Sequence, residues 1–187
     1  MIKIKDYEVP NQADEMTVEQ FDKMNEIIKN EELDNIEKWL AVFEMFGVPE
    51  ETFDDYDFKD FKELIVQFNA TTNNLEKITS LEIDGYTYQA PERIGVKDLG
   101  MIEKAWKSDS KTFASETAAL IFKRTDLSKV EHYAPAHIKQ KAKLLKDQKA
   151  SIVIPYILEV LEKLTESTKQ LKDEVAKELE STEGWTV

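Results

Sequence analysis

Residue types suited to catalysis are scarce in this sequence, and their spacing does not suggest a shared site. His132 and His137 are the two histidines. Their five-residue separation does not place two metal ligands on one face of a helix, as a four-residue step would. Cysteine is absent, and no serine lies in a Gly-x-Ser-x-Gly motif. The sequence therefore predicts no metal ion and no cysteine or serine nucleophile.

The glycines and the carboxylates lead to the same expectation. The five glycines are scattered, whereas a loop that cradles phosphate needs several close together. The acidic run Asp54-Asp55-Tyr56-Asp57 lacks the alternating ligands and the central glycine of a calcium loop. We therefore expect no catalytic residues, no cofactor and no metal, and we interpret the chain as a non-enzymatic protein.

The charge is large and unevenly distributed. The formal net charge is −13, and residues 1–74 hold 19 acidic and 7 basic side chains. Residues 75–150 hold 11 acidic and 14 basic ones, and residues 151–187 hold 8 and 4. Such acidity argues against binding to nucleic acid or to an anionic membrane. It favours a basic protein partner for the first segment, with Asp54, Asp55 and Asp57 as candidate contacts. Alternatively, the first two segments attract each other, or the charges form solvated faces.

The second segment carries a run of basic residues near its end. A solvated helix face, or a dock for the acidic segment, explains this run better than a nucleic-acid site does, because the net charge of the chain is strongly negative. The run comprises Lys123, Arg124, Lys129, Lys139, Lys141, Lys143, Lys146 and Lys149.

The spacing of apolar residues predicts two strand pairs, each followed by three helices. Residues 2–9 and 81–88 alternate apolar and polar side chains, and Asp84-Gly85 suits a tight hairpin turn. Helical spacing places Ile36, Phe58 and Val96 on apolar faces that we expect to be buried. The predicted helices begin near Thr17, Asp34, Asp57, Val96, Thr112 and Pro135, and the one from Thr112 runs to about Lys123.

The order of these elements indicates a tandem duplication. Ile4 corresponds to Ile83 at an offset of 79 residues, and Phe21 corresponds to Leu99 at an offset of 78. We expect an α+β, mainly α-helical protein with an acidic first copy in residues 1–74 and a mildly basic second copy in residues 75–150. A helical extension follows in residues 151–187. Chance similarity between two amphipathic patterns is the alternative.

The extension contains apolar residues at the four- and three-residue steps of a coiled-coil seam. Such a seam would join identical chains into an oligomer, whereas a terminal helix packed along its own chain would show a similar pattern. The candidate contacts are Ile157, Leu161, Leu164, Leu171 and Val175.

Each predicted copy opens in the same order, with a strand pair, a tyrosine, a proline and then a helix start. The helix starts are Thr17-Val18-Glu19-Gln20-Phe21 and Gly95-Val96-Lys97-Asp98-Leu99. Over most of residues 1–150 this order resembles small proteins of tailed bacteriophages, such as tail assembly chaperones and other acidic virion-assembly proteins. The extension lies outside the pattern, and no catalytic residues transfer with it.

The resemblance implies a chaperone or scaffold that binds a phage structural protein during particle assembly. A stable neck, tail or internal protein of the virion is one alternative, and an acidic regulator that mimics nucleic acid is another. The sequence has no apolar core of a signal peptide at its start and no long apolar segment that would span a membrane. We therefore expect the host cytoplasm or the virion as its location, and no membrane partner.

Overall fold

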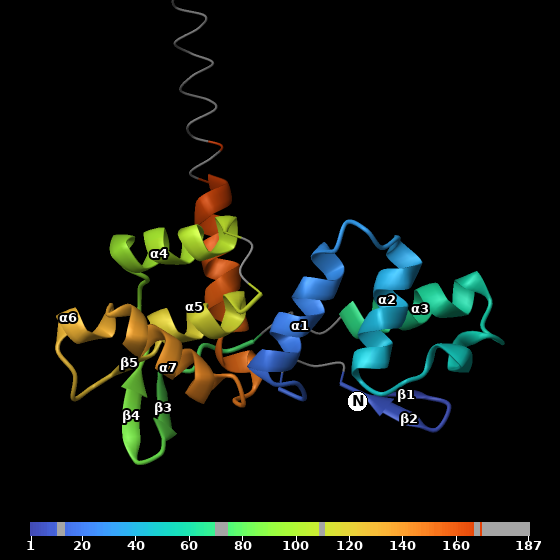
Figure 1. The fold of residues 1–187 in the computed structure, drawn as a ribbon, viewed down its shortest axis with the longest axis horizontal. Helices are drawn as coiled ribbons and strands as arrows, with labels where there is room; N and C mark the ends of the chain where they lie inside the picture. The colour runs from blue at the N-terminus through green and yellow to red at the C-terminus, as the bar shows by residue number, and fades with distance from the viewer. Residues whose placement is uncertain (11–13, 70–74, 109–110, 167–168, 170–187) are drawn as a thin grey trace, which may run out of the picture.

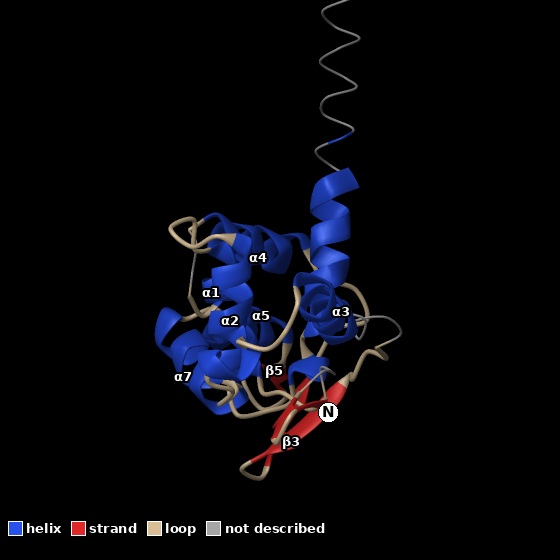
Figure 2. Ribbon diagram, turned by 90° about the vertical axis from the view of Figure 1, so that its right-hand side faces the viewer, coloured by secondary structure: helices blue, strands red, loops and turns tan. Residues whose placement is uncertain are grey.

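The computed structural model shows a largely helical α+β fold with two small antiparallel sheets, which confirms the predicted fold class (Figure 1). Figure 2 shows the strands in the lower part of the molecule and helices in most of the rest. The structure describes residues 1–10, 14–69, 75–108, 111–166 and 169.

The N-terminal hairpin joins β1 (Ile2–Ile4) to β2 (Tyr7–Val9), with Ile4 opposite Tyr7. Lys5 lies in the turn with a φ of +50°, the left-handed conformation that tight turns between twisted strands require. Ile4 and Val9 are fully buried. The alternation seen in the sequence therefore sets the inner face of this hairpin.

Three helices and a short 3-10 helix complete the acidic half of the chain. The Thr17 hydroxyl accepts a hydrogen bond from the Gln20 N–H, and the Gln20 side chain accepts one from the Thr17 N–H. Asp34 and Glu37 form the same reciprocal cap. The elements are α1 (Val18–Lys29), α2 (Asn35–Met45), η1 (Glu50–Phe53) and α3 (Phe58–Asn69).

Aromatic rings fill the core of this half, which we call the first core. The Phe43 ring lies at its centre and is fully buried. Ring centroids of Phe53, Phe61 and Phe68 lie 5.3, 6.1 and 5.9 Å from that of Phe43. The tilted and edge-on arrangements are those that aromatic pairs favour. These contacts hold α2, η1 and α3 against one another.

The second hairpin joins β3 (Ser80–Ile83) to β4 (Tyr86–Gln89), and its turn is the predicted Asp84-Gly85 pair. Both turn residues have a positive φ, +52° and +76°, as a type I′ turn requires. A third strand, β5 (Lys123–Arg124), pairs with β4. The prediction that helix continues to Lys123 is therefore wrong. The helix ends at Ile121, because Phe122 takes an extended conformation and buries its ring.

A second core surrounds α5 (Phe113–Ile121), of whose nine residues eight are buried. Its alanines allow close approach of α4 (Val96–Lys107) and α7 (Pro135–Leu145). The last long helix that the structure describes covers residues 154–166 (the red helix of Figure 1). Its residues Tyr156 and Val160 are buried in this second core. The other elements are α4 (Val96–Lys107), α6 (Lys129–His132), α7 (Pro135–Leu145) and η2 (Ala150–Ile152).

Helix α1 joins the two cores. Its first N–H groups, of Val18 and Glu19, donate to the carbonyls of Gln148 and Lys146 at 2.8 and 2.9 Å. Without these partners the N–H groups would lack acceptors, since the first turn of a helix has none of its own. Val18 accordingly belongs to the second core, while Ile154, at the start of the helix over residues 154–166, belongs to the first.

The buried Asp22 carboxylate of α1 caps α5 from outside that helix. It accepts hydrogen bonds from the N–H groups of Ala114 at 2.6 Å and Ser115 at 3.0 Å, and from the Ser115 hydroxyl. Thr112, the residue before α5, provides no side-chain cap. A side chain 92 residues before Ala114 in sequence thus supplies the acceptor that a helix N-terminus needs.

Three apolar residues that we expected to be buried are exposed. The exposed fraction is 46% for Ile36, 70% for Phe58 and 88% for Val96. The prediction is wrong at these positions because each lies at or next to the start of its helix. Helical spacing identifies the face of a helix, but it does not indicate where along the helix the core ends.

Candidate functional site: an acidic groove

The exposed Ile36 and Phe58 lie on one groove, formed where α2, η1 and the start of α3 meet. Its volume is about 240 Å³, which is below the range of about 300–1,000 Å³ usual for small-molecule pockets. This size fits one or two side chains of a partner better than a cofactor. We call it the acidic groove, and it is lined by Ile36, Leu40, Glu50, Phe53, Asp54, Tyr56, Asp57, Phe58 and Phe61.

The floor of the groove belongs to the first core. Phe53 and Phe61 are buried, with ring centroids 5.4 Å apart, and the Tyr56 ring lies 5.5 Å from that of Phe53. Close packing of these rings fixes the shape of the floor before any partner arrives. Phe58 and Ile36 stand on this floor as exposed apolar surface, which is characteristic of a binding site.

Carboxylates form the rim. Asp54, Asp57 and Glu50 line the groove, so two of the three acidic residues predicted from the sequence belong to it. Asp57 also caps α3, since its Oδ1 accepts a hydrogen bond from the Asp60 N–H at 2.8 Å. Asp55, the third predicted residue, is not among the lining residues. Its carboxylate lies 3.3 Å from the Lys5 ammonium in an exposed ion pair.

The sequence pattern identified the rim of this groove and missed its apolar part. Ile36 and Phe58 were assigned to the core, although Phe58 directly follows the acidic run. An aromatic residue at the first position of a helix, beside several carboxylates, is a signal that could have marked it as exposed. Glu50 gave no signal, because it reaches the groove through the fold of η1.

The predicted C-terminal seam divides between the core and the surface. Ile157 is buried in the second core, and Leu161 and Leu164 pack partly against it. Leu161 and Leu164 also line a shallow groove beside Trp106 of α4. Leu171 and Val175 lie outside the described residues. The first part of the run therefore packs along its own chain.

Asp98 of α4 forms a polar cluster with Lys123 and Tyr133. The Asp98 carboxylate lies 2.6 Å from the Lys123 ammonium and accepts a hydrogen bond from the Tyr133 hydroxyl at 2.8 Å. The Lys123 ammonium also donates to the Tyr133 oxygen at 3.0 Å. Desolvation opposes protonation of Lys123, but these two partners together hold the pKa of its ammonium above the usual value. Each member has a partner, so the cluster serves structure better than catalysis.

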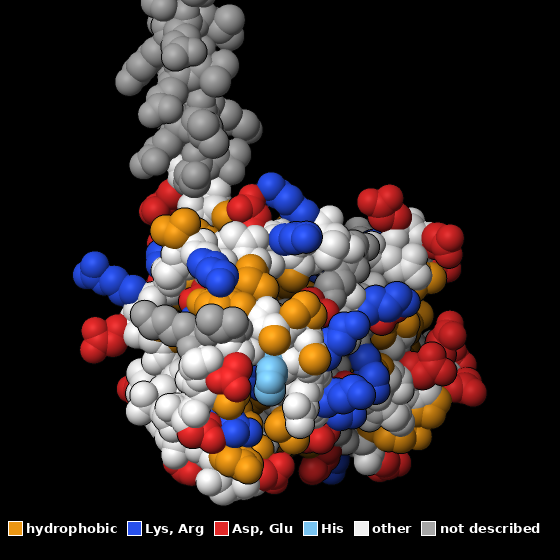
Figure 3. Space-filling model, turned by 60° about the vertical axis from the view of Figure 1, so that its left-hand side comes forward, with side chains coloured by type: hydrophobic (Ala, Val, Ile, Leu, Met, Phe, Trp, Pro, Cys, Tyr) orange, Lys and Arg blue, Asp and Glu red, His pale blue; other side chains and the backbone are white. Residues whose placement is uncertain are grey.

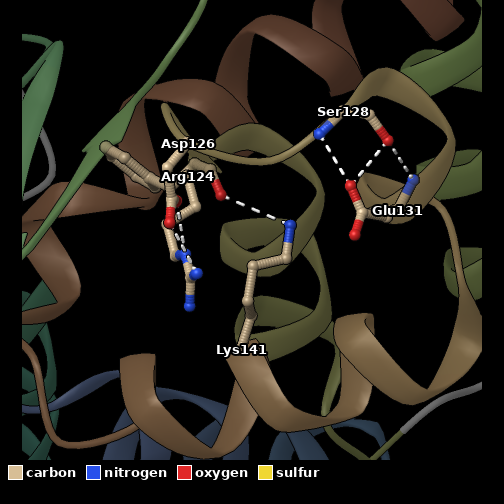
Figure 4. Close-up of polar contacts among 6 residues, drawn as sticks. Arg124, Asp126, Ser128, Glu131 and Lys141 are labelled. Atoms are coloured by element: carbon tan, nitrogen blue, oxygen red, sulfur yellow. Dashed lines mark hydrogen bonds and ion pairs between the residues drawn. The ribbon is translucent and has the colours of Figure 1, made fainter.

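Lys141 of α7 is buried, and its positive charge has only a weak polar contact to offset the loss of water (Figure 4). Its ammonium points at the Phe122 carbonyl oxygen at 3.5 Å, which is longer than a normal hydrogen bond. Burial, aided by the nearby Lys123 charge, lowers the pKa of Lys141 to about 8. Figure 4 also shows Arg124 against Asp126 and Ser128 against Glu131 on either side.

The two histidines of the sequence do not form a metal site with the acidic residues around them. Within the described residues, no three His, Asp or Glu side chains gather closely enough to hold a metal ion. His132 is buried, and burial lowers the pKa of its imidazole, with further lowering from the charges of Lys141 and Lys123. Its Nδ1 has no hydrogen-bond partner in the described part of the chain.

The basic residues near the end of residues 75–150 divide between the surface and the junction. Lys139, Lys143 and Lys146 of this run line a groove between α1, α5 and α7. The Lys146 ammonium lies 3.6 Å from the Glu19 carboxylate of α1. This pair fits the expectation that part of the basic run faces the acidic half.

None of the described helices combines the length and the apolar character needed to cross a lipid bilayer. No protein-family model, no curated protein and no solved structure matches this chain. The acidic groove, with its exposed Phe58 and Ile36 and its carboxylate rim, is the feature from which a function can be inferred.

Proposed function

We propose that the protein is a non-enzymatic binding protein whose acidic groove receives a basic, apolar segment of a protein partner. The supporting observation is the pairing of exposed Phe58 and Ile36 with Asp54, Asp57 and Glu50 on one groove. Apolar contacts would provide the affinity, and the carboxylates would select lysine or arginine beside the apolar side chain.

Bacteriophage particle assembly, in the role of a chaperone or scaffold, is the setting that fits this chemistry and the resemblance of the two helix starts. A stable virion component is the second candidate. Purified particles would contain such a component and would lack a chaperone. The nucleic-acid mimic has less support, because a mimic needs charge alone, whereas Phe58 is 70% exposed at the groove.

A tandem duplication is part of the same proposal. Ile4 pairs with Tyr7 next to the first turn, and Ile83 pairs with Tyr86 next to the second. Each hairpin is followed by a helix of twelve residues, α1 or α4. The copies would then have diverged, with the groove in the first copy and a third strand, β5, in the second.

A fluorescently labelled amphipathic peptide of leucine and lysine tests the proposal. We expect the peptide to bind the protein, and we expect peptides in which glutamate replaces lysine, or serine replaces leucine, to bind far more weakly. Phe58→Ser should weaken binding by roughly tenfold or more, because loss of a central aromatic contact typically costs about 2 kcal/mol. Fluorescence anisotropy measures each affinity.

Two further variants make the test specific. Val66 is also exposed on α3, at 59%, and does not line the groove, so Val66→Ser is the matched control and should bind as the wild type does. Asp57→Asn keeps a side chain that can cap α3 while removing the charge, and should weaken binding of the lysine peptide at low salt. Equal binding by Phe58→Ser and Val66→Ser would refute the proposal.

A further inference from the structure

The start of α4 exposes an apolar residue between basic ones. Val96 is 88% exposed, and Glu92, Arg93, Gly95 and Lys97 are exposed as well, so two basic side chains and one acidic side chain surround it. Gly95 has no side chain to cap the helix, and the acidic residue of the first turn, Asp98, is buried. We call residues 93–97 the α4 tip. Its chemistry, an apolar side chain flanked by positive charge, is the chemistry that the acidic groove selects.

A polar network fixes the shape of this tip. Asp98, two residues after Val96, is held by Lys123 and Tyr133 at 2.6 and 2.8 Å. The Lys97 ammonium lies 3.7 Å from the centre of the Tyr133 ring. The negative charge of Asp98 is thereby buried and paired, and does not neutralise the tip. A preformed tip also loses little conformational freedom on binding.

The α4 tip and the acidic groove lie at opposite ends of the molecule. In Figure 1, whose longest axis is horizontal, α4 begins on the left, with α6 further left, while α2 and α3 lie on the right. The tip therefore does not reach the groove of its own chain. Figure 3, which brings the left-hand side forward, shows Lys and Arg side chains among hydrophobic ones on that face, with Asp and Glu side chains present as well.

We infer that the acidic groove of one copy receives the α4 tip of a second copy. Val96 contacts Phe58 and Ile36, and Lys97 and Arg93 lie against the carboxylates of Asp54 and Asp57. Two different surfaces meet in this contact, so it joins copies head to tail and leaves a free groove and a free tip at the ends of each oligomer. The inference rests on the proposed function, because it names the partner of the same groove.

Sedimentation velocity of the full chain over a wide range of concentration tests this contact. We expect the average mass of the wild type to rise with concentration. Val96→Asp removes the tip and Phe58→Ser removes the groove, and each variant should remain a monomer. Both changes are at exposed positions, so the variants should retain the fold. Val66→Asp, at an exposed position outside both surfaces, should associate as the wild type does.

Mixing the two monomeric variants gives the sharpest result. Val96→Asp retains a groove and Phe58→Ser retains a tip, so the mixture should form a heterodimer with one copy of each and no larger species. A wild type that stays monomeric, or a mixture that does not associate, would overturn the head-to-tail contact. The leucine–lysine peptide, measured on Val96→Asp, separates the two failures. If it binds, the groove remains a protein-binding site, and if it does not, the proposed function fails as well.

Discussion

Replacement of Asp22 tests how the two halves of the molecule are held together. Its carboxylate caps α5 from α1 and accepts hydrogen bonds from two backbone N–H groups and one hydroxyl. Asp22→Ala removes both acceptor oxygens and all three hydrogen bonds at once. The N–H groups of Ala114 and Ser115 lie at the start of α5, where no preceding turn of helix can accept from them.

The expected loss of stability is about 2 kcal/mol. Loss of an N-cap acceptor costs about 1 kcal/mol, and a buried N–H left without a partner costs about 1–3 kcal/mol. Two effects reduce the sum. Asp22 borders two surface grooves, so water can reach part of the vacated site. Burial also raises the pKa of the Asp22 carboxyl, despite its hydrogen bonds from Ser115 and Ala114, so removal of the carboxyl relieves a desolvation cost.

Urea denaturation followed by circular dichroism measures this loss. A change of about 2 kcal/mol lowers the urea midpoint by roughly 1 M at an ordinary slope. Glu26→Ala is the matched control, one turn further along α1. Glu26 pairs with the exposed Lys111, and a surface pair contributes about 0–1 kcal/mol. If Asp22→Ala loses no more stability than Glu26→Ala, the cap is not what holds α1 to α5.

The pH dependence of Asp22→Asn gives an independent check. Burial raises the pKa of the Asp22 carboxyl in the folded state above its usual value of 3.8. The folded protein then binds a proton more readily than the unfolded chain does. The stabilising effect is complete below the unfolded pKa and is lost as the pH rises through the folded pKa. The wild type should therefore gain stability over Asp22→Asn as the pH is lowered from neutral. An unchanged difference would contradict the cause given for the shift.

Two further predictions concern the second core. Lys141→Met should raise the free energy of unfolding by about 1–2 kcal/mol near neutral pH, because it removes a poorly compensated buried charge. Burial lowers the pKa of Lys141 to about 8 in the folded state. The stability of the wild type should therefore rise towards that of Lys141→Met as the pH increases from about 8 to the unfolded pKa of about 10.5. Urea midpoints of both proteins at the two pH values measure this change. A chain that ends at Ala150 should lose the helical signal of the second half, because it lacks core residues Ile152, Val153, Tyr156, Ile157 and Val160, whose truncation costs about 2–5 kcal/mol each. Circular dichroism measures this loss, and melting equal to that of the full-length protein would show that the helix over residues 154–166 is dispensable.

Local signals in the sequence were sufficient for most of the elements. The capping box of Thr17 and Gln20, the Asp84-Gly85 turn and the proline at the start of α7 are each encoded within a few residues, and each is present in the structure. Such features involve backbone groups that neighbouring side chains reach whatever the rest of the chain does. For this reason they could be read without knowledge of the fold.

Features that join distant segments could not be predicted in this way. β5 forms because β4 offers it an edge, and a two-residue strand has no periodicity of its own. From the sequence alone, Asp22 is an ordinary polar residue on α1, because its role as a cap depends on the position of α5. The sequence predicts part of the acidic groove, because Asp54 and Asp57 lie in one acidic run. It does not predict the exposure of Phe58, which depends on how η1 and α2 pack at the edge of the first core.

The junction of the two halves explains why charge remains available at the ends of the molecule. Hydrogen bonds of Val18, Glu19 and the buried Asp22 make this junction, and together they use few of the 19 acidic side chains in residues 1–74. The excess negative charge therefore stays with the acidic groove, while the α4 tip carries positive charge at the opposite end. Long-range attraction between such ends speeds the encounter of two copies and orients them. The lifetime of the contact would then depend on the apolar pair of Val96 and Phe58, because exposed charges alone contribute little to affinity in physiological salt.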